Sequence, residues 1–348
     1  MITCRLIRSV SSLLTVAAVT VASAASPTSA QDAGLIEAAK REGAVTWYTT
    51  QIVDPLVREV IAAFGKKFGI KADFYRGGST DVAIKIQQES NAGRMFADIF
   101  DGPTPPEALK KFNLVERWLP ESTKEFNPAF VDPEGFWAAT NDTLQSTAVN
   151  TELVRPTEFP KSWNDLLAPR FKGKIIWSST PSFSGATGFI GLVIKERGAA
   201  SAMDFFKQLA QQRPAGNSGS ARAVMDQVVS GEYAVGLQMF PNHAAASIKL
   251  GAPIRWLPAE PAISGVVSAI AMTKGAPHPN AAKLLLTFIL GEEGQTIFRN
   301  NFYIPANPHV QPIDPDLDPN KYRTIHISPA ELISQEPSWT AIFNDVFK

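Results

Sequence analysis

The sequence predicts an α/β protein with two lobes, each a mainly parallel β-sheet flanked by helices, joined by strands that cross between the lobes. Three observations support this fold class. The 348 residues correspond to about two domains at roughly 150 residues per domain. Short β-type apolar runs alternate with helical patterns, which is typical of βαβ units. No low-complexity linker separates the two halves, so the chain is expected to cross between the lobes in ordered segments.

The composition is that of a globular protein with no bulk charge. Hydrophobic residues make up 45% of the chain and charged residues 19%, and 33 basic side chains balance 33 acidic ones. Without a net charge there is no general attraction for nucleic acid or for an anionic membrane. A ligand must therefore be recognised by local groups. The single cysteine, Cys4, excludes an internal disulfide or a thiolate metal cluster.

Residues 1–30 have the pattern of a cleavable signal peptide. Arg5 and Arg8 form a basic region, and an apolar stretch follows at 10–22. This stretch is shorter than the roughly 20 apolar residues that a membrane-spanning helix needs. Small residues then lead to Ala30, after which we expect cleavage. The alternative is a buried N-terminal helix. No second stretch of this kind follows, so the mature protein is not expected to be embedded in a membrane.

The first half of the mature chain alternates helices with strands. Asp54 and Pro55 mark one helix start as a cap and a proline at the first helical position, while Gly43 and Gly69 mark helix ends. The predicted elements are a helix at 32–41, a strand at 44–48, a helix at 56–64, a strand at 70–75, a helix at 81–90 and a strand at 97–100.

The same alternation returns in the second half. The predicted elements are a helix starting at 163, a strand at 174–177, helices at 184–195, 201–211 and 218–229, strands at 233–237, 254–257 and 263–272, and helices at 279–290 and 339–347. Two segments, Phe136–Val149 and Ile263–Met272, are the best candidates for crossing between the lobes.

Several motifs occur in a fixed order. They are VTWYTT at 45–50, YRGGS at 75–79, ADIF at 97–100, SFSGAT at 182–187, and an apolar helix at 281–290 that runs into GEEGQ at 291–295 and YIPANP at 303–308. Together they resemble the periplasmic solute-binding proteins of type II fold. The closest branch holds binders of ferric iron, phosphonates, sugar phosphates, thiamine and polyamines.

The resemblance implies a first lobe of residues 31–140 and 269–348, and a second lobe of residues 141–268. The ligand would lie in the cleft between them and be held by lobe closure. The resemblance further implies a periplasmic location, a small-molecule ligand, no cofactor, a monomeric state, and an ABC permease with its ATPase as partners.

Two turns rich in glycine and serine open helices and are the strongest candidates for ligand contact. A helix N-terminus presents free N–H groups and about half a positive charge, so two such ends facing one cleft would form an anion site. The competing interpretation is plain helix capping; the resemblance favours the second turn as part of the cleft. The candidates are Gly78 and Ser79 in the first turn, and Ser184, Gly185, Ala186 and Thr187 in the second.

Other candidates follow the strands. Thr49 and Thr50 lie at the carboxyl end of the first strand, where ligands bind in open α/β sheets. Asp101 holds the same position after the third strand and could bind a ligand amine or cap the next helix. Arg76 could pair with a phosphate or carboxylate, or remain a solvated surface residue.

The resemblance adds candidates later in the chain. Asn217 and Tyr303 lie where relatives place cleft residues, with a helix cap and a half-buried tyrosine as the alternatives. Met239 and Phe240 lie where ferric-iron binders carry two adjacent tyrosines; this chain has no adjacent tyrosine pair. Apolar walls, suited to an organic solute with a polar end, are predicted there instead. His243 and Tyr303 are the alternative metal ligands.

Three functions remain open. The leading hypothesis is the periplasmic substrate-binding component of an ABC importer, capturing a small organic solute with a phosphonate, phosphate ester or carboxylate group. The alternative is ferric-iron binding, with a synergistic anion, and the remote alternative is an exported enzyme. The four histidines show no metal-ligand spacing, and motifs such as G-x-S-x-G and H-E-x-x-H are absent. No catalytic residue is therefore predicted.

Overall fold

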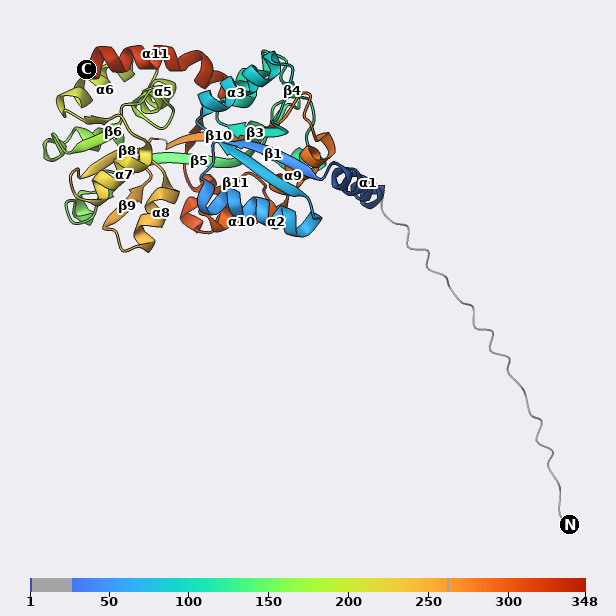
Figure 1. Ribbon diagram of the computed structural model, residues 1–348. Helices are drawn as coiled ribbons and strands as arrows, with labels where there is room; N and C mark the ends of the chain where they lie inside the picture. Colours follow the sequence, from blue (N-terminus) through green and yellow to red (C-terminus); the bar gives the residue numbers. More distant parts are fainter. Residues whose placement is uncertain (2–26, 262) are drawn as a thin grey trace.

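The computed structural model describes Met1, residues 27–261 and residues 263–348. Most of the predicted signal peptide, including Cys4, lies outside the described residues. The first helix begins at Pro27 and so includes both sides of the predicted cleavage point after residue 30. Two lobes lie side by side, and two long strands run between them (Figure 1).

The first lobe alternates helices and strands much as the sequence predicts. Its elements are α1 (Pro27–Glu42), β1 (Ala44–Thr49), α2 (Arg58–Phe68), β2 (Lys71–Arg76), α3 (Ser79–Asn91), β3 (Ile99–Gly102), α4 (Pro105–Lys110) and β4 (Val115–Glu116). Gly69 ends α2 in the left-handed conformation, with φ of 71°, which glycine adopts without strain. The start of the second helix is less regular than predicted, because Val53–Val57 forms a wider π-type turn ahead of α2.

The rest of the chain forms the second lobe and then returns to the first. Its elements are β5 (Trp137–Asn150), β6 (Ile175–Ser178), α5 (Ala186–Arg197), α6 (Ala199–Gln211), β7 (Ala215–Asn217), α7 (Ala221–Val229), β8 (Val235–Met239), α8 (Pro241–Lys249), β9 (Ile254–Leu257), β10 (Ile263–Thr273), α9 (Pro279–Leu290), α10 (Glu292–Asn300), β11 (Ile304–Pro305), β12 (Thr324–His326) and α11 (Pro329–Phe347). Short 3-10 turns occupy several connections, including 163–167, where the sequence predicted a helix.

The strands join into one continuous hydrogen-bonded path in the described part of the chain. Its order is β2-β1-β3-β10-β5-β8-β6-β7, with β4 and β12 on β10 and β9 and β11 on β5. In the first lobe β1 pairs in parallel with β2 and β3, and in the second lobe β6 pairs in parallel with β7 and β8. The antiparallel pair β5 and β10 lies between these two parallel groups. The predicted fold class is therefore confirmed, including the two crossing strands.

The crossing strands contain a bulge at the junction of the lobes. Ser268 lies opposite Asn141 and the next residue, Ala269, lies opposite Ala139, so Thr140 is an extra residue in β5. An extra residue leaves ladder groups unpaired and bends the strand. Because these groups are buried, they need partners from elsewhere in the fold.

Gln295 supplies a partner to the freed backbone, and Gln51 bonds the polar side chains beside the bulge. Gln295 Nε2 donates to the carbonyl oxygen of Thr140 at 2.9 Å, and its Oε1 accepts from the backbone N–H groups of Ala306 and Asn307. Gln51 Nε2 donates to Ser268 Oγ at 3.0 Å and to Asn141 Oδ1 at 3.2 Å. The loop after β1, the two crossing strands and the segment after α10 are thus tied together at one buried point.

Each lobe has its own apolar core. Buried side chains of the first core come from residues 39–139 and 267–306, and those of the second from residues 149–266 and 327–343. The C-terminal helix therefore packs with the second lobe, whereas the sequence analysis placed all of 269–348 in the first. The centroids of the Trp177 and Phe343 rings lie 5.9 Å apart, and α11 follows the outer side of α5 and α6 (Figure 1). We propose that residues 329–347 belong to the second lobe.

The start of α11 also differs from the prediction, which began this helix at residue 339. Ser328 and Glu331 form a capping box, and Pro329 occupies the first helical position. These are strong signals for a helix start. The interior Pro337, which normally breaks a helix, explains why the pattern was interpreted as a shorter helix.

Replacing Gln295 with leucine is expected to lower the free energy of unfolding by at least about 3 kcal/mol, because several buried backbone groups lose their partners. Urea unfolding followed by circular dichroism measures the change. Gln208→Leu, on the exposed face of α6, is the control and should change stability by less than about 0.5 kcal/mol. Equal stability of the two variants would contradict the role given to Gln295.

Replacing Gly191 with alanine tests the packing of α11. A Cβ atom at this position would lie 2.7 Å from ring atoms of Trp339, and overpacking of this kind costs about 1–3 kcal/mol. Gly34→Ala in α1 is the control, because no atom lies within 4 Å of the added group and alanine favours an exposed helix by up to about 1 kcal/mol. If Gly191→Ala is as stable as wild type, α11 does not pack as described.

Candidate ligand cleft between the lobes

A cleft of about 440 Å³ lies between the lobes, with the crossing strand β5 as its floor. Its walls are formed where the parallel strands end. Thr50 follows β1, Arg76 ends β2 and Pro103 follows β3 in the first lobe. Residues after β6, β7 and β8 line it from the second lobe, among them Ser184 and Phe240. This is the edge at which open α/β sheets bind ligands.

Because helices follow these strand ends, four helix N-termini face the cleft. They belong to α3 in the first lobe and to α5, α7 and α8 in the second. Among the four N-caps, only that of α7 uses its side chain: Ser220 accepts from the N–H of Ala223. The first-turn N–H groups of α5 and α8 have no side-chain cap. Each end carries a partial positive charge. At α3 the Asp81 carboxylate offsets this charge, because it accepts from the Gly78 N–H at 3.0 Å, so the positive potential of the cleft comes mainly from the other three ends.

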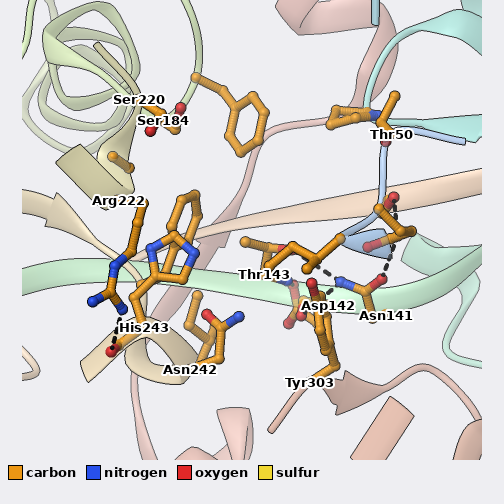
Figure 2. A pocket seen from close by; sticks show the side chains of 18 of the residues that line it. Thr50, Asn141, Asp142, Thr143, Ser184, Ser220, Arg222, Asn242, His243 and Tyr303 are labelled. Atoms are coloured by element: carbon orange, nitrogen blue, oxygen red, sulfur yellow. Dashed lines mark hydrogen bonds between the residues drawn. The ribbon is translucent and has the colours of Figure 1, made fainter. Parts of the chain in front are cut away.

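Two arginines add full positive charges. Arg76 is exposed at the end of β2 and forms no ion pair within the described residues. Arg222, in the first turn of α7, donates to Asp226 at 2.7 Å and approaches the carbonyl oxygen of His243 at 3.5 Å. Figure 2 shows Arg222, Ser184 and Ser220 on the second-lobe side, opposite Thr50 and Tyr303. The Asp226 pair is partly exposed, so Arg222 can turn to a ligand at little cost.

Nearby carboxylates are withdrawn from the cleft. Asp142 lies in the floor, but its side chain is fully buried, where it accepts from His326 Nε2 at 2.9 Å and from the N–H of Thr143. Asp101 lies behind the wall and accepts from both threonine hydroxyls at the end of β1, Thr49 and Thr50. Burial raises the pKa of Asp101 to about 6, against the lowering effect of these hydrogen bonds. Positive groups therefore dominate the surface that a ligand would meet.

His243 and Tyr303, the alternative metal ligands, both line the cleft. Burial, assisted by the charge of Arg222, lowers the pKa of His243 to about 4, so its imidazole is neutral at pH 7. Burial, assisted by the charge of Asp101, raises the pKa of Tyr303 to about 12, so its phenol keeps its proton. Within the described residues, no group of three His, Cys, Asp or Glu side chains is arranged to hold a metal.

The cleft brings together about half of the residues predicted from sequence. Those that line it are Thr50, Gly78, Ser79, Ser184, Phe240, Tyr303 and His243. Those that do not are Thr49, Asp101, Gly185, Ala186, Thr187, Asn217 and Met239. The sequence allowed Arg76 either a contact with the ligand or a solvated surface position. The structure places it in the cleft lining.

The excluded residues support the walls from behind. Thr187 is buried and donates to the carbonyl oxygen of Ser182, which shapes the turn before α5. Asn217 accepts from the N–H of Gly219 and donates to Gln227, so its amide is already engaged. Met239 is the last residue of β8 and its side chain is fully buried. Neighbouring residues of an extended chain face opposite ways, so only Phe240 of the pair reaches the cleft.

Sequence reasoning missed the contributions of α7, α8 and the floor. The missed residues include Asn141, Asp142, Ser220, Arg222 and Asn242. The signal for Ser220 was available, since a serine precedes an apolar helical pattern there. The predicted helix start at 218 instead placed Ser220 and Arg222 inside the helix, away from its N-terminus.

Residues 97–326 match the family model described as bacterial extracellular solute-binding protein. The chain belongs to this family. A solute-binding protein requires a cleft between two lobes, and the cleft of this chain lies between its two lobes. None of the described helices has the length and apolar character needed to cross a membrane.

The relatives of this solute-binding protein are named for, or were solved with, different ligands. The Fe(3+)-binding periplasmic protein of Serratia marcescens is 23% identical over 85% of this chain and 90% of its own. Among solved structures, AfuA from Actinobacillus pleuropneumoniae with fructose-6-phosphate bound has a TM-score of 0.73 and 23% identity, covering 88% of this chain and 98% of its own. Iron-bound HitA from Pseudomonas aeruginosa has a TM-score of 0.72 and 24% identity, covering 87% and 99%. These relatives are binding proteins, in agreement with the prediction that the chain is not an enzyme.

The lowered pKa of His243 predicts a pH dependence of stability. Between pH 6.5 and about 4 the unfolded chain carries a proton on His243 that the folded chain lacks. Stability is therefore lost as pH falls through this window. His243→Gln should reduce this loss by on the order of 2 kcal/mol, measured by urea unfolding at several pH values.

The exposed His309 provides the control for this prediction. Glu125 raises the pKa of His309, so its contribution to stability has the opposite sign, being present at low pH and lost as pH rises. His309→Gln should therefore not reduce the loss of stability at acid pH. An acid loss in His243→Gln equal to that of wild type would show that His243 is protonated freely in the cleft.

Proposed function

We propose that this protein captures a small organic solute bearing a phosphonate, phosphate ester or carboxylate group, and delivers it to an ABC importer. The observation that carries the proposal is the convergence of four helix N-termini and two arginines on one cleft. Helix N-termini and arginine side chains are the groups that proteins use to bind oxyanions. The withdrawal of Asp101 and Asp142 from the cleft surface supports the same charge preference.

Both lobes contribute to this positive surface, which supports capture by closure. Arg76 and the N-terminus of α3 lie in the first lobe, and Arg222 with the other three N-termini lies in the second. An open, empty cleft keeps these like charges apart. An anion between them gains contacts with both lobes only when the lobes approach, so the ligand itself favours the closed state. A permease could then distinguish the closed, loaded protein from the open one.

Ferric iron is the alternative, and some relatives are named for it, whereas others are named for 2-aminoethylphosphonate or hold fructose-6-phosphate. Fe(III) is a hard cation that prefers phenolate and carboxylate ligands. Tyr303 is the one tyrosine among the cleft-lining residues, and the raised pKa of its phenol opposes phenolate formation unless a metal displaces the proton. Iron binding here would therefore depend on an accompanying anion in the positive cleft.

A thermal-shift panel tests the proposal, with phosphonates, sugar phosphates, phosphate, carboxylates, polyamines, thiamine and Fe(III) citrate. A ligand present at about 100 times its dissociation constant raises the free energy of unfolding by roughly 2.7 kcal/mol. The melting temperature then rises by several degrees. We expect organic anions to raise the melting temperature. A rise confined to Fe(III) citrate, with a visible charge-transfer band, would establish the iron alternative. A rise confined to polyamines would contradict the positive cleft.

The anion that gives the largest rise is then tested against Ser184→Asp, which places a negative charge at the N-terminus of α5. Repulsion should weaken binding by at least about tenfold in isothermal titration calorimetry. Ser201→Asp adds the same charge on the exposed surface of α6, outside the cleft, and should leave affinity unchanged. Equal affinities of the two variants would disprove the role of the α5 N-terminus.

A further inference from the structure

Three phenylalanine rings line the cleft beside its positive groups: Phe183 and Phe240 from the second lobe and Phe302 from the first. All three are only partly buried. The centroids of the Phe183 and Phe240 rings lie 6.5 Å apart with their planes tilted by 59°. Partly exposed rings that gather in a concave site are typical of a surface that awaits an apolar partner.

A strained residue positions the two second-lobe rings together. Gln238 has φ of 58°, in the left-handed region that non-glycine residues rarely adopt. Its side-chain Nε2 donates to Gln145 Oε1 at 3.0 Å and contacts the carbonyl oxygen of Phe183 at 3.4 Å. One buried residue therefore fixes the backbone that precedes Phe240 and holds the turn that carries Phe183.

The backbone next to each ring is also fixed. The Met239 carbonyl oxygen, beside Phe240, accepts from Trp256 Nε1 at 2.9 Å. Gly188 packs so closely on the turn that an added Cβ would lie 1.8 Å from the carbonyl oxygen of Phe183. The backbone that carries the rings is held in place before any ligand arrives, and a preorganised surface binds with a smaller loss of entropy.

The first-lobe ring occupies a strained position as well. Phe302 follows the last turn of α10 with φ of 64°, a position at which glycine or asparagine is normally found. A bulky aromatic residue there destabilises the fold, and such strain concentrates at functional sites. Of the four non-glycine residues with positive φ in the described chain, Gln238 and Phe302 are the two that serve the cleft rings.

The rings lie close to the anion-binding ends of the helices. Phe240 is the N-cap residue of α8, and Phe183 lies two residues before the N-cap of α5. A ligand with its acid group at these helix ends would place its body against both rings. His243 extends this wall, with its imidazole edge-on to Phe240 at 4.9 Å. It is neutral at pH 7, so the wall carries no charge.

We propose that the solute is an aromatic anion, with its acid group at the helix N-termini and its ring against Phe183 and Phe240. This inference rests on the proposed function, because it assumes that an organic anion occupies the cleft. It adds that the body of the ligand, and not only its acid group, determines selection. Aromatic pairs favour tilted or offset geometries, and their interaction free energy is larger than the burial of their area alone would give.

Isothermal titration calorimetry with methylphosphonate, butylphosphonate and phenylphosphonate tests the inference on protein purified from cells expressing the whole 348-residue chain. The three probes share one acid group and differ in the body. We expect phenylphosphonate to bind at least about tenfold tighter than methylphosphonate and tighter than butylphosphonate.

The outcomes separate the two proposals. Equal binding of all three phosphonates would overturn the aromatic inference and leave the anion proposal standing. Butylphosphonate binding as tightly as phenylphosphonate would overturn it too, since any apolar body would then serve. If no phosphonate binds, benzoate and acetate repeat the comparison with a carboxylate. Failure of these acids as well overturns the aromatic inference, and the thermal-shift panel, which includes sugar phosphates, then decides the proposed function separately.

Variants locate the effect on the rings. Phe183→Leu and Phe240→Leu keep an apolar side chain of similar size, and each should weaken phenylphosphonate roughly tenfold while leaving methylphosphonate within about twofold. Phe112→Leu is the control, because that ring is 61% exposed and lies outside the cleft lining. Undiminished selectivity for phenylphosphonate in both cleft variants, with melting temperatures close to wild type, would overturn the contact. If a variant fails to fold, the probe series on wild type still decides the matter.

Discussion

The bulge at Thr140 is the constraint on which the arrangement of the cleft depends. An extra residue in β5 frees buried polar groups where the two lobes meet, and these groups must be satisfied inside the fold. Gln295 satisfies the backbone carbonyl of Thr140, and Gln51, from another segment of the first lobe, bonds the Ser268 and Asn141 side chains beside it. Gln51 directly follows Thr50, and Gln295 also holds the backbone just beyond Tyr303. The hydrogen bonds that stabilise the junction therefore also position two cleft residues.

The electrostatics of the cleft follow from the direction of the strands. Parallel strands end at one edge of each group, so the helices that follow them begin at that edge and present their N–H groups to the same space. The positive potential of the cleft needs few charged side chains for this reason. Asp142 and Asp101 are engaged with His326 and with the threonines at the end of β1, so they help to hold the floor and wall without cancelling that potential.

Strain in the backbone is concentrated where the cleft meets its apolar wall. Gln238 turns the chain near the end of β8 so that Met239 completes the core and Phe240 enters the cleft. Phe302 takes a conformation that suits glycine better. Neither residue is required by the regular elements beside it. Both are maintained because the surrounding structure fixes their positions, and both place polar and aromatic groups of a binding surface within reach of one solute.

The sequence by itself determined the alternation of helices and strands, the fold class and the family, because apolar periodicity, caps and turn residues act over short stretches of chain. It also identified turns such as 77–80 and 182–187, whose composition marks helix starts. The tertiary structure decided which of their residues face the cleft. Thr187 and Met239 turn inward while Ser184 and Phe240 do not, and this depends on packing against distant segments. The same holds for Arg222, whose position at a helix start became clear only with the boundary of α7, and for α11, whose partners in the second lobe are separated from it by more than one hundred residues. Long-range packing of this kind leaves no local pattern in the sequence.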